Sequence, residues 1–137
     1  MNRLYILLTV TVVMVAAPLF GAHEALADLL TGTALNDNLV GGETDDYLKG
    51  RAGDDYLDSG GANDTIEGGR GNDRIFPGEG DDDILAGAGN DLIYARDTDG
   101  VDYIDCGAGF DKVETIHRDD RTRSNCERVL GPRQGDI

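Results

Sequence analysis

The chain has 137 residues, which is enough for one domain and not for two. Its formal net charge is -15, glycine occurs 20 times, and the apolar residues are too scattered for a large layered core. Glycine this frequent, without a collagen triplet, indicates either disorder or a repeat architecture. The acidity argues against a nucleic-acid partner.

Residues 1–27 have the pattern of a secretory signal peptide. Arg3 supplies a short positive region, residues 4–15 are apolar apart from two threonines, and residues 25–27 (A-L-A) form a cleavage pattern. The alternative is an uncleaved membrane anchor, because residues 4–20 are about long enough for a short span. We expect cleavage, no membrane insertion of the mature chain, and a secreted protein that begins with a short lead at residues 28–31.

A nine-residue period follows. Residues 32–114 divide into nine blocks of nine, with a two-residue insertion, Ala95-Arg96, before the eighth block. The fourth place is glycine in six blocks. The eighth place is always aliphatic, from Leu39 to Val113. The sixth place is always aspartate: Asp37, Asp46, Asp55, Asp64, Asp73, Asp82, Asp91, Asp102 and Asp111.

The period predicts an all-β solenoid. One large aliphatic side chain per block cannot form a core alone, and it is buried only when successive blocks stack. Because side chains alternate across a strand, places seven and nine point outward while place eight points inward. The other six places return the chain, and their glycines permit positive φ.

The turns also carry the ligands of a hard cation. Turn carbonyls and the place-six carboxylates are oxygen donors, and Ca²⁺ takes about six to eight of them, whereas Mg²⁺ requires a tighter octahedron. The alternative is that aspartate and glycine are only good turn formers. That explains their enrichment but not a carboxylate at one fixed place. Rows of carboxylates repel one another, so we expect a largely disordered apo chain that folds as calcium binds.

The nine blocks resemble the RTX, or haemolysin-type, calcium-binding repeat family, whose nonapeptide is G-G-x-G-x-D-x-U-x. The resemblance implies a right-handed parallel β-roll in which two blocks form one coil and several Ca²⁺ ions lie between stacked turns. One edge would then stack Asp37, Asp55, Asp73, Asp91 and Asp111, and the other Asp46, Asp64, Asp82 and Asp102. Carbonyls of the glycine-rich turns would complete the sites, for example those of Gly53, Gly69, Gly71, Gly78, Gly80, Gly87 and Gly89.

The sites are not expected to be equal. Three blocks lack the fourth glycine, one begins with proline, and the insertion interrupts both edges. We expect the sites that flank Asp37 and Asp111 to be weak or empty. The strongest are expected at Asp55/Asp73, Asp73/Asp91 and Asp64/Asp82.

Residues 115–137 lose the period and are predicted to form a short irregular C-terminal cap over the last coil. Cys106 opens the ninth block, and Cys126 lies in the cap. Two cysteines in an exported protein favour a disulfide, which would tether the cap. A metal site and free thiols are the alternatives.

The pattern favours a non-enzymatic, monomeric calcium-binding protein, because no catalytic set is recognisable in the sequence. One alternative is an adhesion module that binds a cell-surface glycan or protein through Phe76 and Tyr94, which are 18 residues apart at place nine. Ordinary cross-strand packing would also explain those two rings. The other alternative is a small polysaccharide-modifying enzyme, because rolls of this family accompany such enzymes.

Overall fold

The computed structural model describes residues 27–96, 99–116 and 119–131. The predicted signal peptide lies outside the described residues except for Ala27. None of the described residues forms a helix of the length and hydrophobicity that crossing a bilayer requires. The described elements are twelve short strands: β1 (Leu29–Thr31), β2 (Asn38–Val40), β3 (Tyr47–Ala52), β4 (Tyr56–Asp58), β5 (Thr65–Arg70), β6 (Arg74–Phe76), β7 (Asp83–Ala88), β8 (Leu92–Ala95), β9 (Tyr103–Asp105), β10 (Lys112–Thr115), β11 (Arg121–Thr122) and β12 (Arg128–Leu130).

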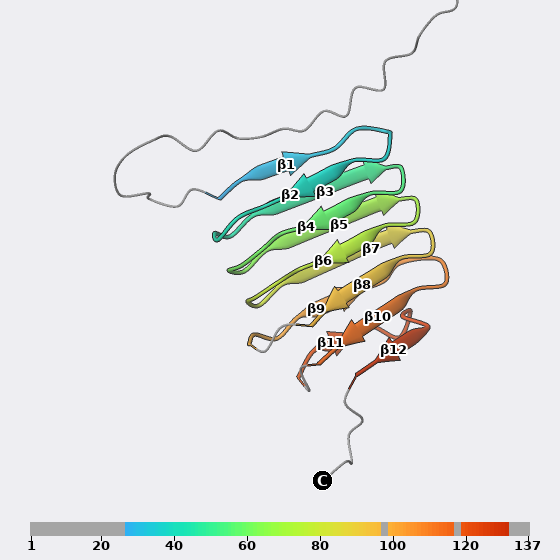
Figure 1. Ribbon diagram of the computed structural model, residues 1–137. Helices are drawn as coiled ribbons and strands as arrows, with labels where there is room; N and C mark the ends of the chain where they lie inside the picture. Colours follow the sequence, from blue (N-terminus) through green and yellow to red (C-terminus); the bar gives the residue numbers. More distant parts are fainter. Residues whose placement is uncertain (1–26, 97–98, 117–118, 132–137) are drawn as a thin grey trace, which may run out of the picture.

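The strands form two six-stranded parallel sheets. The odd-numbered strands make one sheet, in the order β1-β3-β5-β7-β9-β11, and the even-numbered strands make the other. The chain therefore changes sheet at every turn, and each coil contributes one strand to each sheet, as Figure 1 shows. Within a sheet, Leu48 pairs with Ile66 and Leu57 with Ile75, so neighbouring coils are offset by one pair of blocks. This confirms the predicted parallel β-roll.

The core consists mainly of the place-eight side chains, as the sequence predicted, together with Leu30, Ala86, Ala95 and Cys106. In β4, Leu57 is buried while Tyr56 and Asp58 on either side are only partly so, which is the expected alternation. Full burial of one such aliphatic side chain contributes roughly 1.5–3 kcal/mol. Eight of these side chains are 0% exposed: Leu48, Leu57, Ile66, Ile75, Ile84, Ile93, Ile104 and Val113.

The two-residue insertion does not break either sheet. β8 pairs with β10 through Leu92 and Lys112, and β7 pairs with β9 through Asp83 and Tyr103. These partners are two residues further apart in sequence than those of the earlier coils. The extra length therefore lies between β8 and β9 in the sequence, and stacking continues beyond it.

Both sheets extend past the predicted repeats. Upstream, β1 pairs with β3, and its Leu30 is 6% exposed and joins the core. Downstream, β11 pairs with β9 and β12 pairs with β10. The segment that the sequence assigned to an irregular cap therefore also supplies the last rung of each sheet.

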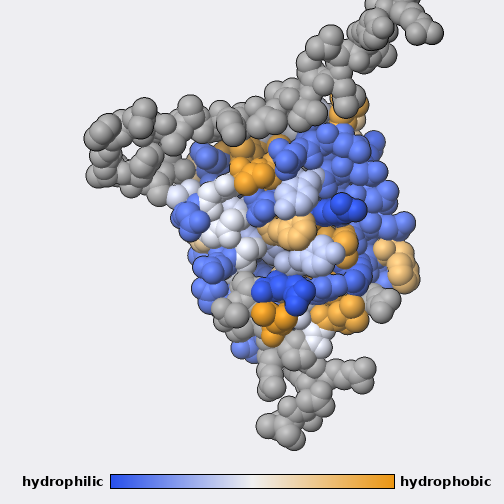
Figure 2. All heavy atoms as spheres, in the orientation of Figure 1, coloured by the Kyte–Doolittle hydropathy of each residue, from blue (hydrophilic) through white to orange (hydrophobic). Residues whose placement is uncertain are grey.

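The outward positions are mostly polar. Figure 2 shows a largely hydrophilic surface on one face, with apolar residues in separate patches. On the sheet of even-numbered strands, the ring of Phe76 stacks on that of Tyr94 at 4.9 Å between centroids, and Tyr56 lies 5.1 Å from Phe76 on the other side. Phe76 and Tyr94, which are 18 residues apart in the sequence, therefore lie on adjacent rungs. Their mutual contact is the cross-strand packing that accounts for such rings without a ligand.

Candidate metal sites in the turns

The nine predicted aspartates each end a turn, directly before a strand. The turns that lead from odd- to even-numbered strands carry Asp37, Asp55, Asp73, Asp91 and Asp111, and those that lead back carry Asp46, Asp64, Asp82 and Asp102. This is the division between two edges that the sequence predicted. Except for Asp37, which is half-buried, each of these aspartates is at most 4% exposed.

A hydrogen-bond ladder runs along each edge. Oδ1 of every aspartate from the second coil onward accepts a hydrogen bond from the main-chain N–H of the aspartate one coil earlier. These bonds are 2.8 Å long at Asp37–Asp55, Asp55–Asp73, Asp73–Asp91 and Asp91–Asp111. On the other edge they are 2.7 Å at Asp46–Asp64, 2.8 Å at Asp64–Asp82 and 3.2 Å at Asp82–Asp102. One oxygen of each carboxylate is thus fixed by its neighbour.

The second carboxylate oxygen, Oδ2, has no such partner in several of the described turns. Within the described part of the chain, Oδ2 accepts no hydrogen bond and is buried in Asp55, Asp64, Asp73, Asp91 and Asp111. Leaving one buried polar atom unsatisfied costs about 1–3 kcal/mol, and more for a charged group. A bound cation would remove this cost.

Backbone carbonyls of the next coil border the same space. A β-carbon built on Gly50 would lie 2.4 Å from Oδ2 of Asp55 and 2.5 Å from the carbonyl oxygen of Gly68. One built on Gly68 would lie 2.6 Å from Oδ2 of Asp73 and 2.3 Å from the carbonyl oxygen of Ala86. A carboxylate oxygen of one turn and a carbonyl oxygen of the next therefore converge where a side chain would otherwise fit. This donor set matches a hard divalent cation.

Side chains alone do not complete a site. Across the described residues, no three acidic, histidine or cysteine side chains gather closely enough to hold a metal ion. A metal ion in these turns would therefore need main-chain carbonyls as its remaining ligands, which are among the oxygen donors that Ca²⁺ accepts.

The turn glycines let the coils approach each other. The seven predicted glycines, Gly53, Gly69, Gly71, Gly78, Gly80, Gly87 and Gly89, all have positive φ. At Gly71 and Gly89 a β-carbon would lie 1.9 and 1.8 Å from a carbonyl oxygen of the coil before. Arg51 and Ala62 take the same left-handed conformation at a φ of 79° without being glycine, which is strained for an L residue.

Burial raises the pKa of Asp55 to about 6 and that of Asp91 to about 7, although a main-chain hydrogen bond to each acts in the opposite direction. Burial also raises the pKa values of Asp64, Asp73 and Asp111. Every charge that contributes to these five shifts is another carboxylate. The edges therefore hold uncompensated negative potential, which a divalent cation would neutralise.

The first turn on each edge differs from the rest. Oδ2 of Asp37 accepts hydrogen bonds from the main-chain N–H and the hydroxyl of Thr33. Oδ2 of Asp46 accepts one from the N–H of Gly42 at 2.7 Å. These aspartates cap their own turns and leave less capacity for a cation. The sequence-based expectation of a weak site at Asp37 agrees with this geometry, whereas Asp111 has the geometry of the interior rungs.

The ladders include residues that the sequence analysis did not select. The N–H of Asp28 donates to Oδ1 of Asp46 at 2.8 Å, and the N–H of Asp102 donates to Oδ1 of Asp120 at 3.2 Å. The N–H of Asp111 donates to Oε2 of Glu127 at 2.8 Å. Each of these acids stands two places before a residue that faces its sheet partner in β3, β9 or β10. The spacing of an acid two places before such a residue was the available signal.

A second ladder was also missed. The place-five side chains accept hydrogen bonds from the coil that follows, in the opposite direction to the aspartates at place six. Asn36 accepts from the N–H of Asp54 at 2.9 Å, and Asn72 accepts from that of Asn90 at 2.8 Å. Asparagine or aspartate occupies place five in the first seven blocks, and that regularity would have predicted this ladder.

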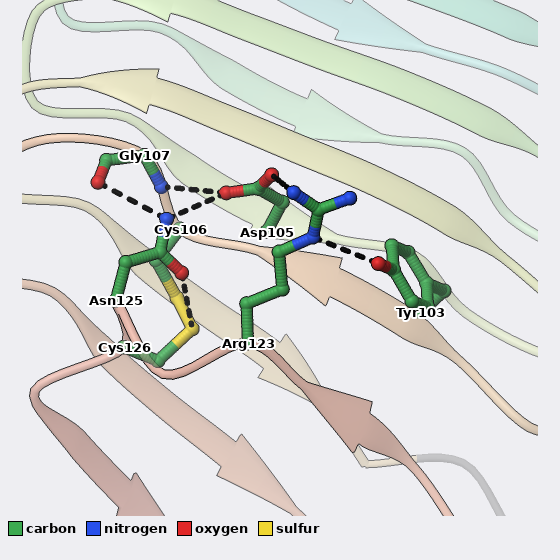
Figure 3. A network of polar contacts seen from close by, with 7 residues as sticks. All are labelled: Tyr103, Asp105, Cys106, Gly107, Arg123, Asn125 and Cys126. Carbon is green, nitrogen blue, oxygen red and sulfur yellow. Dashed lines mark hydrogen bonds and ion pairs between the residues drawn. A yellow bond between two sulfur atoms is a disulfide. The ribbon is translucent and has the colours of Figure 1, made fainter.

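The C-terminal segment is fastened to the last full coil. Cys106 and Cys126 form a disulfide with Cα atoms 5.2 Å apart, as predicted. Beside it, Arg123 bonds to Tyr103 at 2.7 Å and pairs with Asp105 at 3.0 Å, as Figure 3 shows. The side-chain amide of Asn125 donates to Asp105 at 2.6 Å and to the carbonyl of Gly107 at 3.2 Å.

Comparison with protein families gives three overlapping matches to the RTX calcium-binding nonapeptide repeat (4 copies), at residues 31–66, 58–93 and 78–113. Together they cover residues 31–113, which is more than half of the chain. The chain therefore belongs to this family and is a calcium-binding repeat protein. No match was found among curated proteins or among solved structures.

Proposed function

We propose that the chain is an exported, non-enzymatic protein that binds several Ca²⁺ ions between its stacked turns and folds as it binds them. The nine ladder aspartates and the carbonyls of the glycine-rich turns are the proposed ligands. The observation that carries the proposal is the row of buried Oδ2 atoms that accept no hydrogen bond from the described residues. At Asp55 and Asp73 this atom borders a carbonyl oxygen of the next coil.

Calcium supplies one thing to this fold, which is positive charge between two coils. The chain supplies everything else. The Oδ1–amide bonds orient each carboxylate, the positive-φ glycines bring the carbonyls close, and the aliphatic column keeps the turns in register. Without the ion, the stacked carboxylates oppose the burial that the column favours. Metal binding and folding should therefore be coupled.

The decisive experiment is a calcium titration of the oxidised, exported chain, followed by far-UV circular dichroism from a chelator-treated start. We expect a cooperative gain of β signal at about 10⁻⁴ to 10⁻³ M Ca²⁺, the range of extracellular calcium modules. Mg²⁺ should give little of it. A chain that is already folded in chelator and indifferent to calcium would refute the proposal.

Export is a separate part of the proposal. Its support is the signal-peptide pattern at residues 1–27 and the Cys106–Cys126 disulfide, which is typical of oxidising compartments. Intact-mass measurement of the protein recovered from the medium of an expressing bacterium should give a chain that starts at Asp28. A product found only in the membrane fraction at full length would favour the anchor instead.

The charge of the turn edges also bears on the partners of the protein. We infer a monomer without a nucleic-acid partner, because the turn edges are rows of carboxylates.

The adhesion alternative rests on Phe76 and Tyr94, and their ring-to-ring contact accounts for both side chains. Retention on a glycan that is lost on Phe76→Ala, with the calcium-dependent β signal intact, would restore that alternative. Product formation from a polysaccharide would likewise restore the enzyme alternative.

A further inference from the structure

The last coil ends one of the two ladders with a different acid. Oε2 of Glu127 accepts the N–H of Asp111 at 2.8 Å, the distance at which Oδ1 of Asp111 accepts the N–H of Asp91. Glu127 lies beyond residue 113, where the family match ends. It stands directly before β12, just as each ladder aspartate stands before its strand.

The spacing of this rung also differs from that of the others. Asp111 and Glu127 are 16 residues apart, whereas the first three rungs of this edge are 18 apart and the Asp91–Asp111 rung is 20 apart. The turn before β12 is thus two residues shorter than the interior turns. β12 nevertheless keeps the register of the earlier rungs, with Arg128 opposite Lys112.

The second carboxylate oxygen of Asp111 is a candidate cation ligand. Asp111 is 0% exposed, and within the described residues its Oδ2 accepts no hydrogen bond. In the equivalent turn, Oδ1 of Asp55 faces the preceding coil while Oδ2 borders the carbonyl of Gly68 in the following coil. By analogy with Asp55 we expect Oδ2 of Asp111 to face the coil that carries Glu127, with Cys106 standing where the Asp55 turn has Gly50. The negative charge of Glu127 also acts on Asp111.

The turn that carries Glu127 is held in place from three directions. Cys126, the residue before Glu127, forms a disulfide with Cys106 at the start of the Asp111 turn. Asn125 binds the carbonyl of Gly107 in that same turn at 3.2 Å. On the other side, β12 pairs with β10. Two carboxylates are therefore fixed near each other at the end of the ladder. The one charge that raises the pKa of Asp111 is the negative charge of Glu127, and no positive charge of the described residues offsets it.

We propose that Asp111 and Glu127 form a terminal divalent-cation site, the last of its edge, which the disulfide holds together. The inference rests on the proposed calcium binding of the roll and adds to it a site outside the nine repeats. Because the turn of Glu127 is attached through Cys126, the site belongs to the oxidised chain. Reduction should release it before the interior sites.

The test counts calcium ions bound per chain by equilibrium dialysis with elemental analysis. The oxidised wild type is compared with Glu127→Gln at about 10 mM free Ca²⁺, which is above the weak end of the extracellular range. The substituted side chain would retain an oxygen acceptor for the Asp111 amide but lose the charge. Glu79→Gln is the matched control, since Glu79 is an exposed turn residue outside both ladders.

We expect one ion fewer in Glu127→Gln, the wild-type number in Glu79→Gln, and an unchanged β signal in both. Reduced wild type should also bind one ion fewer. Equal numbers and equal affinities in wild type and Glu127→Gln would overturn the terminal site while leaving the roll a calcium binder. Loss of the whole β signal in Glu127→Gln would also overturn it, since Glu127 would then be structural. A wild type that binds no calcium would refute the proposed function itself.

Discussion

The main-chain N–H of Asp55 donates to Oδ1 of Asp73 at 2.8 Å, so the same position in two consecutive coils is joined by a side chain. This bond fixes the carboxylate and leaves Oδ2 of Asp73 buried without a hydrogen bond within the described residues. The two oxygens therefore have separate tasks. One sets the stacking of the coils, and the other is left for a cation.

Replacing Asp73 by asparagine separates those tasks. Asp73→Asn keeps an oxygen for the Asp55 amide but replaces Oδ2 with an NH₂ group, which does not bind a cation. We expect the midpoint of the calcium titration to rise about tenfold, equivalent to about 1.4 kcal/mol. In chelator the variant should retain at least as much β structure as the wild type, because one stacked charge is gone.

Asp83→Asn is the control for this variant, since Asp83 is an exposed outward residue of β7. It removes the same charge from the chain without touching a ladder. Circular dichroism and calorimetric titration measure both variants. Equal midpoints for Asp73→Asn and Asp83→Asn would mean that net charge, and not ligation, controls the response to calcium.

Protonation of the buried aspartates should stabilise the folded chain in part, as calcium does. The pKa values of about 6 at Asp55 and about 7 at Asp91 lie above that of an unfolded aspartate, so the folded chain binds protons more tightly than the unfolded one. This contribution to stability is complete below about pH 4, the pKa of the unfolded group. It is lost as the pH rises through 6 and 7.

In calcium-free buffer we therefore expect the β signal to increase when the pH falls from about 7.5 to about 5. Over the same range the calcium midpoint should move to higher concentration, because protons compete for the carboxylates. Asp91→Asn should reduce both effects. A calcium-free β signal that stays constant or decreases on acidification would contradict the uncompensated charge that we assign to the edges.

Backbone strain in the turns predicts that two substitutions at the same place of neighbouring blocks have opposite effects on stability. Ala62 has a φ of 79°, whereas Gly71 occupies the same place one block later with a φ of 120°. Ala62→Gly should stabilise the calcium-loaded chain by about 1 kcal/mol, because the strain of a left-handed alanine exceeds the added chain entropy.

Gly71→Ala should destabilise the chain by more than Ala62→Gly stabilises it, because the new methyl would lie 1.9 Å from the carbonyl oxygen of Gly53. Urea unfolding in saturating calcium measures both changes. The account of the turns fails if the two substitutions shift the free energy of unfolding in the same direction.

The sequence predicted the repeating part of the fold because one property repeats at every block. Leu57 and Ile75 follow from their place in the period, and so do the paired positions of Asp55 and Asp73. Glu127 was not predicted, because its turn is two residues short and its acid is not aspartate, so the nine-residue period does not mark it and only its spacing to Val129 does. Stacking on β10 nevertheless places it in the ladder.

The difference between the first turns and the later ones could be predicted only in part. The absence of the fourth glycine marked the first two blocks as irregular. It did not show that Oδ2 of Asp46 would bond to the amide of Gly42, since this depends on the local φ and ψ of the turn. Side-chain partners of this kind need coordinates, whereas the periodic core does not.

The disulfide provides the last prediction. Cys106 and Cys126 close a loop with a sequence separation of 20, and loop-closure entropy assigns such a link about 3 kcal/mol. The double variant Cys106→Ser/Cys126→Ser should lose about that much stability in saturating calcium. Hydrogen exchange should rise first in β11 and β12, since the link and the contacts of Arg123 and Asn125 fasten only that end. Protection in β5 and β6 should remain, because their coils stack on neighbours at both sides. A uniform loss of protection along the roll would instead mean that the disulfide stabilises the stack as one cooperative unit.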